Sequence, residues 1–213
     1  AAAKDNRTRI DIGTSLGNKG NDQDAFFAHA KETRALFETL FDGFNNPVTM
    51  MYDALQKLGG EKKIMTAYEP DGRRYGPAVF RVHYGGHSYK PHIDHVVLRE
   101  KRFTYGVSRY QHQFAGILCF QNSADDGESG EAFISNCPWT PDLQPVLTDK
   151  SFPEYAARHR IERVQVNLEP GDLYFFFSEN IHEVPRIVGD TPRAVLAIFF
   201  AMSPDDDEIF VWS

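Results

Sequence analysis

His92 and Asp94, one residue apart, are the first side chains in this sequence that can do metal chemistry together. On a strand, residues two apart point to the same face, so the pair can offer an imidazole nitrogen and a carboxylate oxygen to one ion. A third ligand must then come from elsewhere in the chain. Two histidines and one carboxylate on one side of a metal leave its other positions open, which suits iron(II) oxygen chemistry. Alone, the pair is a weak signal, because a surface histidine beside a solvated aspartate gives the same pattern.

A second sequence segment places a histidine and an arginine beside apolar runs. His182 follows a turn at residues 169–172 and an aromatic run at 173–177, and Arg193 precedes another apolar run. A cation at the edge of a buried strand is costly unless it has an anionic partner, and the planar guanidinium matches a carboxylate. A dicarboxylate cosubstrate can supply that partner. The alternative for Arg193 is a surface salt bridge, which contributes little to stability.

Helical spacing comes first along the chain, after a polar arm with several glycines at residues 1–20. Apolar residues recur at helical intervals from about residue 22 to residue 41, and Asn45, Asn46 and Pro47 end this pattern. A second helix is expected at residues 48–58, closed by the glycines at 59 and 60.

Strand-like patterns follow residue 76. We expect strands at residues 78–84, 114–120, 130–134, 163–168, 173–177 and 194–202, with a final edge strand at 210–212. Alternation at 163–168 is typical of a half-buried strand, whereas the apolar runs at 173–177 and 194–202 are typical of strands buried on both faces. A long segment rich in proline and polar residues lies between the expected strands near 134 and 163, with a short helix at 153–159, and segments of this kind are often lids or binding loops. Helices followed by many short strands predict an α+β domain with an antiparallel barrel or sandwich.

Composition argues against several classes of function. Acidic residues outnumber basic ones, 30 against 23, for a formal net charge of −7, so nucleic-acid binding, which depends on neutralising phosphates, is a poor first hypothesis. No basic run suggests a membrane surface, and no apolar run reaches the roughly 18 residues of a membrane helix. Cys119 and Cys137 are expected to be free, buried or partly buried thiols. We expect a cytoplasmic protein, although the chain begins without Met and an upstream segment stays open.

The ordered motifs of residues 78–202 resemble the prolyl 4-hydroxylase-like branch of the 2-oxoglutarate- and iron(II)-dependent oxygenase superfamily. The shared motifs are a tyrosine-rich phrase leading into His92 and Asp94, Gly-Glu-Ala-Phe at 130–133, Pro-Gly-Asp at 170–172, His182-Glu-Val-Pro and the distal Arg193. Each motif is modest alone, and the ordered set at family-like spacing is specific.

The resemblance implies an α+β fold whose core is a double-stranded β-helix, or jelly roll. A single oxygenase domain would span residues 1–213, with an N-terminal arm and supporting helices at 1–76 and the β-helix core at 77–213. The N-terminal helices would pack on one sheet of that core.

The resemblance also implies the site and its reaction. His92, Asp94 and His182 would bind iron(II), and 2-oxoglutarate would chelate the iron and pair its far carboxylate with Arg193. Oxygen would be the second cosubstrate, and ascorbate stays open as a further cofactor. The product would be a hydroxylated substrate, with succinate and carbon dioxide as co-products. Related halogenases carry a small residue in place of Asp94, which frees a position for chloride, so the aspartate argues for hydroxylation.

Further residues acquire roles only through the resemblance. Tyr84 resembles a hydrogen-bond donor to 2-oxoglutarate, with a satisfied core tyrosine as the alternative. Tyr89, Arg186 and Phe199 are candidates for substrate contact. For Arg186 and Phe199, solvent exposure and core packing are the simpler readings.

The sequence departs from the family pattern where relatives carry a second hydrogen-bond donor to 2-oxoglutarate, so the identity of that donor stays open. Where relatives often carry a tyrosine that reaches the far carboxylate, this chain reads Leu-Cys-Phe-Gln at 118–121. Gln111 or Gln113 are replacements to consider. The other nearby histidines are expected to be structural or to support the site indirectly: His83, His87, His95 and His112.

The substrate is open between two hypotheses. A prolyl residue in a peptide or protein would suit a groove covered by residues 135–162, whereas a free amino acid or other small molecule would suit a closed pocket. A nucleic-acid demethylase is disfavoured by the acidic balance and by the lack of an arginine six residues after Arg193. From other classes, the alternatives are a degenerate barrel that binds a partner and a cupin-like metal-binding protein without oxygenase activity. Cupins favour a His-x-His pair, which this chain lacks. The oligomeric state stays open.

Overall fold

The computed structural model describes residues 7–123 and 130–213, and the statements below concern those residues. The first six residues of the predicted N-terminal arm lie outside this range. The α-helices and strands in chain order are β1 (Arg9–Ile12), α1 (Leu16–Lys19), α2 (Gln23–Thr39), α3 (Pro47–Leu58), β2 (Lys63–Thr66), β3 (Val79–His83), β4 (Tyr89–His92), β5 (Phe114–Gln121), β6 (Ala132–Pro138), α4 (Gln144–Thr148), α5 (Phe152–His159), β7 (Arg163–Val166), β8 (Leu173–Phe177), β9 (Asn180–Val184), β10 (Arg193–Met202) and β11 (Glu208–Trp212).

Local capping fixes where the two long helices begin. The side chain of Asp22 accepts a hydrogen bond from the amide of Ala25 at the start of α2, and that of Asn46 accepts one from the amide of Val48 at the start of α3. Both predicted helices are confirmed, although α2 ends at Thr39, two residues early. No helix in the described residues has the length and apolar character that crossing a membrane requires.

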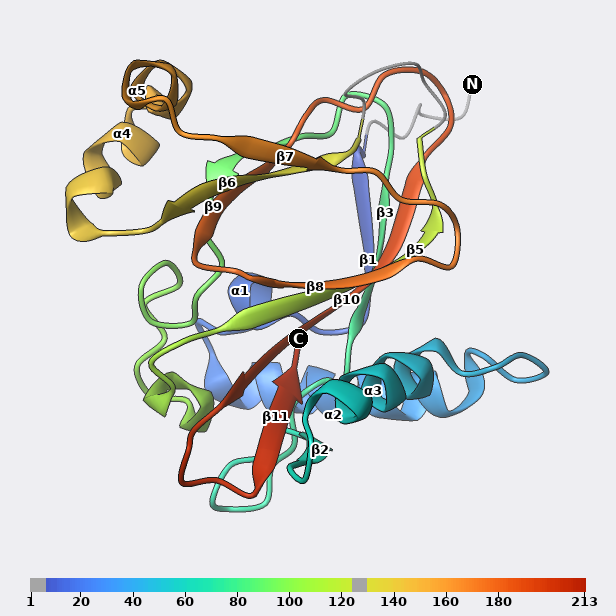
Figure 1. The fold of residues 1–213 in the computed structure, drawn as a ribbon. Helices are drawn as coiled ribbons and strands as arrows, with labels where there is room; N and C mark the ends of the chain where they lie inside the picture. Colours follow the sequence, from blue (N-terminus) through green and yellow to red (C-terminus); the bar gives the residue numbers. More distant parts are fainter. Residues whose placement is uncertain (1–6, 124–129) are drawn as a thin grey trace.

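Two sheets face one another across the molecule (Figure 1). The larger sheet has seven strands, with β10 at its centre between β5 on one side and β3 and β11 on the other. The smaller sheet has the order β4-β9-β6-β7. All pairings are antiparallel except that of β11 with β2. The predicted α+β class with antiparallel sheets is therefore confirmed.

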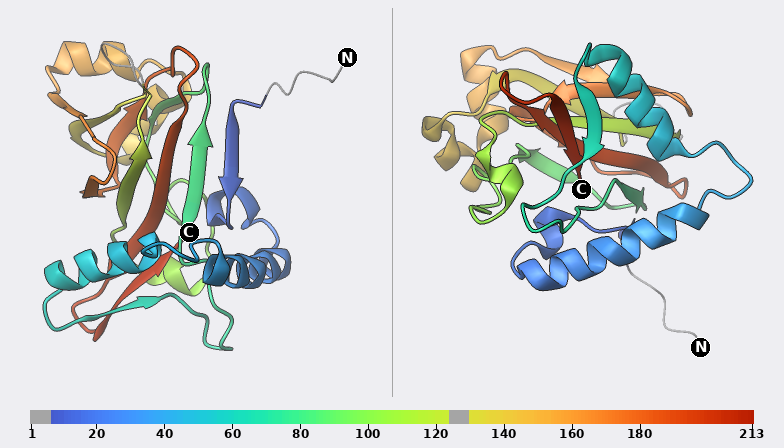
Figure 2. Two further views of the ribbon diagram at one scale, coloured as in Figure 1. Left: turned by 90° about the vertical axis from the view of Figure 1, so that its right-hand side faces the viewer. Right: turned by 90° about the horizontal axis from the view of Figure 1, so that it is seen from below.

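Strand β10 is buried on both faces, as its apolar run predicts. Leu196, Ile198 and Phe200 pack in one core cluster with Met51 and Leu55 of α3. The alternate residues of β10 face the space between the sheets. Helices α2 and α3 thus cover the face of the large sheet that points away from the small sheet (Figures 1 and 2).

Several strand predictions need correction. Val164 is 62% exposed and not half-buried, because β7 is the outer strand of the small sheet and pairs only with β6. The residues of β8 are half-buried, because β8 pairs only with β5. Strand β11 is not an edge, since it lies between β10 and β2. The predicted arm contains β1, which pairs with β3. Cys119 and Cys137 are free, as predicted.

Candidate metal centre

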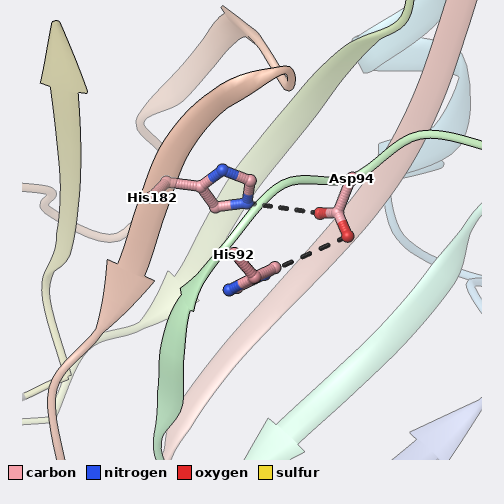
Figure 3. Close-up of side chains that lie close together, drawn as sticks. All are labelled: His92, Asp94 and His182. Atoms are coloured by element: carbon pink, nitrogen blue, oxygen red, sulfur yellow. Dashed lines mark hydrogen bonds and ion pairs between the residues drawn. The ribbon is translucent and has the colours of Figure 1, made fainter. Parts of the chain in front are cut away.

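Three side chains from β4, β9 and the segment after β4 meet between the sheets (Figure 3). His92 ends β4, and the strand pairing places it opposite His182 of β9, with ring centroids 4.3 Å apart. Asp94 completes the group, and the potential ligand atoms of the three residues all lie within 4.8 Å of one another. The predicted ligands are thus brought together, and their binding of iron stays a prediction.

Asp94 is not held in the way that the sequence suggests. Strand β4 ends at His92, so the two-residue strand repeat does not extend to the aspartate. Instead, the Asp94 amide donates to the carbonyl of Ser178 at 2.9 Å, and the Ser178 hydroxyl donates to the Asp94 carbonyl at 2.8 Å. Ser178 is fully buried and follows β8. The large sheet therefore helps to position a ligand that comes after a strand of the small sheet.

Both histidines direct Nε2 toward the Asp94 carboxylate. Nδ1 of His92 lies 2.6 Å from the carbonyl of Lys90, and Nδ1 of His182 lies 2.8 Å from the carbonyl of Asn180. A carbonyl only accepts, so each Nδ1 carries a proton and Nε2 is the ring atom left to face an ion. Nε2 of His182 lies 3.3 Å from Oδ2 of Asp94, and Nε2 of His92 lies 4.0 Å from Oδ1. Two ring nitrogens and a carboxylate that converge in this way are a donor set for a divalent metal.

Charge states in the site match those of metal ligands. Burial, with the neighbouring His182, lowers the pKa of His92 to about 3, so the ring is neutral at neutral pH. Burial opposes ionisation of Asp94, but His182, His92 and Arg99 outweigh it and hold the pKa of the carboxyl well below its usual range. Arg99 donates a hydrogen bond to Oδ1 of this carboxylate. Metal binding therefore needs no proton release from His92 or Asp94 at neutral pH.

The three residues open onto a cavity of about 420 Å³ between the sheets. Arg193, the first residue of β10, lines this cavity and is only 4% exposed. Within residues 7–123 and 130–213, no carboxylate lies within ion-pair distance of its guanidinium. Glu131 is close enough to interact with the charge of Arg193 but forms no ion pair with it. An anionic ligand in the cavity is therefore a suitable direct partner for this buried guanidinium.

The structure separates the other predicted residues into two groups. Tyr89 and Phe199 line the cavity, and the Tyr89 ring lies 5.6 Å from that of His92. Tyr84 is 36% exposed, lies beyond the end of β3 and does not line the cavity. Arg186 is exposed and lies beyond the end of β9. Neither Tyr84 nor Arg186 is placed where its predicted role requires.

Of the two glutamines considered as a second donor to 2-oxoglutarate, only one lines the cavity. Gln113 lines the cavity, but its side-chain oxygen accepts from the Val96 amide. Gln111 is exposed and does not line the cavity.

His95 lines the cavity outside the metal cluster, with Nδ1 accepting from the amide of Val97.

Sequence reasoning missed Tyr174, which lines the cavity from β8. Burial raises the pKa of Tyr174 to about 12, and the charge of Arg193 acts in the opposite direction, so the two groups are close enough to interact. Strict alternation with Phe176, which also lines the cavity, is the sequence signal that could have identified this tyrosine.

The segment at 135–162 does not cover the cavity. Its helices α4 and α5 form a separate apolar cluster around Leu143 and Phe152. None of its residues lines the cavity in the described part of the chain. Residues 15–18, 94–96, 99 and 100 contribute to the walls instead.

The chain matches known proteins over nearly its full length. The family model of the carrier-protein-independent halogenase WelO5 matches residues 3–213. An N-substituted L-amino acid dioxygenase from Burkholderia ambifaria AMMD is similar in structure, with a TM-score of 0.65 and 20% identity over 94% of this chain and 74% of that chain. Its complex with alpha-KG gives a TM-score of 0.62 and 18% identity over the same shares.

A Pseudomonas putida prolyl-4-hydroxylase gives a TM-score of 0.41 and 13% identity, over 93% of this chain and 95% of that chain. No curated protein sequence matches significantly. The likeness to the Burkholderia enzyme supports the fold.

Proposed function

The chain belongs to the family of the carrier-protein-independent halogenase WelO5, within the iron(II)- and 2-oxoglutarate-dependent oxygenases, and we propose that it hydroxylates an unactivated C–H bond of a small molecule. The superfamily predicted from the motifs is confirmed by this family match. Hydroxylation, the site residues and the substrate class are proposals that rest on the geometry of the cavity.

The observation that carries the proposal is one cavity with two complementary sites. His92, Asp94 and His182 offer two nitrogens and a carboxylate, the donor set that suits iron(II) with open positions. Arg193, without an ion pair in the described residues, faces the same cavity. A molecule with a chelating keto acid at one end and a carboxylate at the other fits both sites, as 2-oxoglutarate does.

Each side chain then has a specific task. Iron(II), when bound, supplies the redox chemistry that couples decarboxylation of 2-oxoglutarate to oxidation of the substrate. His92, Asp94 and His182 hold the metal, and Arg193 orients the far carboxylate, with the Tyr174 hydroxyl as second donor in place of Tyr84. We also propose that the two facing sheets form the predicted double-stranded β-helix, which encloses the site and limits access of water.

Asp94 favours hydroxylation over the halogenation that gives the family its name. A small residue at this position would free a coordination position for chloride, whereas the Asp94 carboxylate lies within the ligand cluster. We therefore assign oxygen, and not chlorine, as the atom added to the substrate.

A small-molecule substrate is favoured over a prolyl peptide. The cavity volume of about 420 Å³ falls within the roughly 300–1,000 Å³ of small-ligand pockets. Residues 135–162, which were candidates to cover a peptide, contribute nothing to the cavity wall. Prolyl peptides remain in the assay as the comparison.

The test combines spectroscopy with product analysis. Under anaerobic conditions, iron(II) and 2-oxoglutarate should give the visible absorption of the chelate in the wild type and none in His182→Ala, with His159→Ala as an exposed-histidine control. With oxygen, succinate should form in the presence of free or N-substituted amino acids, and mass spectrometry should show one added oxygen. Metal binding without the chelate absorption or 2-oxoglutarate turnover would instead support the cupin-like alternative.

A further inference from the structure

The inner face of the large sheet gathers positive charge at one end. The strand pairing places Arg9 of β1 opposite His83 of β3, which in turn lies opposite Arg193 of β10. The neighbouring row contains Asp11 and Arg81. Paired residues of antiparallel strands share a face, and Arg9, Arg81 and Arg193 all line the cavity. Only Arg193 has a role in the proposed function.

Arg9 is hydrogen-bonded to the carboxylate of Asp11, whereas Arg81 is only weakly paired with it. Nε of Arg9 donates to Oδ1 of Asp11 at 2.7 Å, a second bond joins Arg9 to Oδ2, and Asn18 donates to Oδ2 at 3.0 Å. Arg81 comes no closer to Asp11 than 3.9 Å. Its side chain is 16% exposed, and its buried Nε has no hydrogen-bond partner in the described residues. Such a donor requires an acceptor that the protein itself does not provide.

The other charges near the cavity have partners of their own. Arg99 pairs with Asp94 and with Glu100. Burial raises the pKa of the Glu131 carboxyl, and the charge of Arg193 acts in the opposite direction, so these two groups are close enough to interact. Asp11 is bonded to Arg9 and approaches Arg81 only to 3.9 Å, which leaves Arg81 as the weakly paired cation of the cavity wall.

The neighbouring histidines add no charge beside Arg81. Burial, reinforced by the charge of Arg193, lowers the pKa of His83 to about 2. Burial, reinforced by Arg9, also lowers the pKa of His87. Neither ring adds a positive charge at neutral pH, and neither supplies an acidic group to Arg81.

We infer that Arg81, with Arg9 beside it, forms a second anion site that binds a carboxylate of the substrate, so that the enzyme acts on small carboxylic acids. This inference rests on the proposed function. The site adjoins the metal centre: the Arg9 guanidinium lies 5.7 Å from the centre of the Tyr89 ring, which lies beside His92. Ala197 and Phe199 of β10 line the same cavity and offer apolar contact to the rest of the substrate.

The experiment titrates pairs of probes that differ only in charge. N-acetyl-L-amino acids with small, aliphatic and aromatic side chains are compared with their carboxamides, by calorimetry, on the anaerobic protein loaded with iron(II) and 2-oxoglutarate. The tightest-binding acid should bind at least about tenfold more tightly than its amide, as for a hydrogen-bonded charge pair. Arg81→Gln should reduce that preference below about twofold, Arg81→Lys should recover part of it, and exposed Arg186→Gln should leave it unchanged.

The affinity for 2-oxoglutarate shows whether Arg81 binds the carboxylate of the substrate or that of the cosubstrate. Titration of the chelate absorption should give the same 2-oxoglutarate affinity, within about twofold, for wild type and Arg81→Gln. The inference is overturned if no acid binds more tightly than its amide. It is equally overturned if Arg81→Gln weakens 2-oxoglutarate and spares the acid preference, because Arg81 then serves the cosubstrate.

Failure of the proposed function is seen separately, as absence of the chelate absorption in the wild type. In that event the same acids and amides are titrated into the protein without iron and cosubstrate, where the Arg81-dependent preference is still expected. Arg9→Gln provides a second variant if Arg81→Gln does not fold, which circular dichroism reports.

Discussion

At the scale of single residues, the site is defined by polar atoms that lack a partner within the protein. The Nε2 atoms of His92 and His182 converge on the Asp94 carboxylate, and the neutral His92 ring has no proton on its Nε2. Arg81 faces the cavity with a buried Nε that has no partner, and Arg193 faces the same cavity without an ion pair in the described residues. Buried polar groups are normally paired, so these unpaired groups mark where a cation and two anions belong.

The hydroxyl of Tyr174 provides a test of the assignment of the second donor. Tyr174→Phe should weaken 2-oxoglutarate binding by roughly tenfold or more, because a hydrogen bond to a charged group contributes about 1.5–3 kcal/mol. Tyr84→Phe is the matched control and should leave the affinity unchanged, since Tyr84 does not line the cavity. Titration of the anaerobic iron(II) protein measures both. An effect of Tyr84→Phe with none of Tyr174→Phe would restore the prediction made from the sequence.

His83 predicts an acid-sensitive contribution to stability. Its folded pKa of about 2 lies below the roughly 6.5 of an unfolded histidine. Below pH 6.5 the unfolded chain therefore binds a proton that the folded protein does not. The free energy of unfolding should fall with pH by up to about 1.4 kcal/mol per unit from this residue.

Urea unfolding of the metal-free protein between about pH 6.5 and 4.5 measures this slope. His83→Gln should have a shallower slope than wild type, while His159→Gln, at an exposed position, should keep the wild-type slope. Equal slopes for wild type and His83→Gln would show that His83 is not buried in its neutral form.

At the scale of elements, the start of α3 predicts a stability effect that leaves the site intact. The Asn46 side chain accepts from the Val48 amide at 2.9 Å. Asn46→Ala should lower the free energy of unfolding by about 1 kcal/mol. Asn45→Ala, at the exposed preceding residue, should have little effect. Denaturant unfolding measures both, and an equal loss in the two variants would exclude a specific role for the Asn46 cap.

Elements whose signals are local were predictable from the sequence. The α3 boundaries follow from the Asn46 cap and the glycine at 59, which need no information from distant residues. The apolar run of β10 likewise predicts burial on both faces, which its packing confirms. The metal cluster was predictable only through the ordered family motifs, because His182 is brought to His92 by the pairing of β9 with β4.

Elements defined by distant partners were missed. Strand β1 reads as a polar arm because Arg9 and Asp11 pair with each other and line or adjoin a charged cavity, which no local pattern reveals. Val164 alternates like a half-buried residue but lies on an outer strand. Tyr84 precedes the metal motif in sequence, but it directly follows His83, which lines the cavity, and neighbouring residues of an extended chain point to opposite faces.

At the scale of the whole molecule, the two ligand sites lie on different sheets. His92 and His182 belong to the small sheet, whereas Arg193 and Tyr174 belong to the large sheet. A cosubstrate bound to the metal and to Arg193 would therefore connect the sheets. Because ligands that bind only the folded state stabilise it by mass action, metal and 2-oxoglutarate should raise the melting temperature in two separable steps.

Each ligand at 100 times its dissociation constant should contribute about 2.7 kcal/mol, or roughly 5–10 °C in a protein of this size. Anaerobic thermal unfolding with iron(II), then with added 2-oxoglutarate, measures the steps, and a chelator should reverse both. Arg193→Gln should keep the iron step and lose most of the 2-oxoglutarate step, while His182→Ala should lose both. A full 2-oxoglutarate step in Arg193→Gln would contradict the assignment of Arg193 as the residue that holds the far carboxylate.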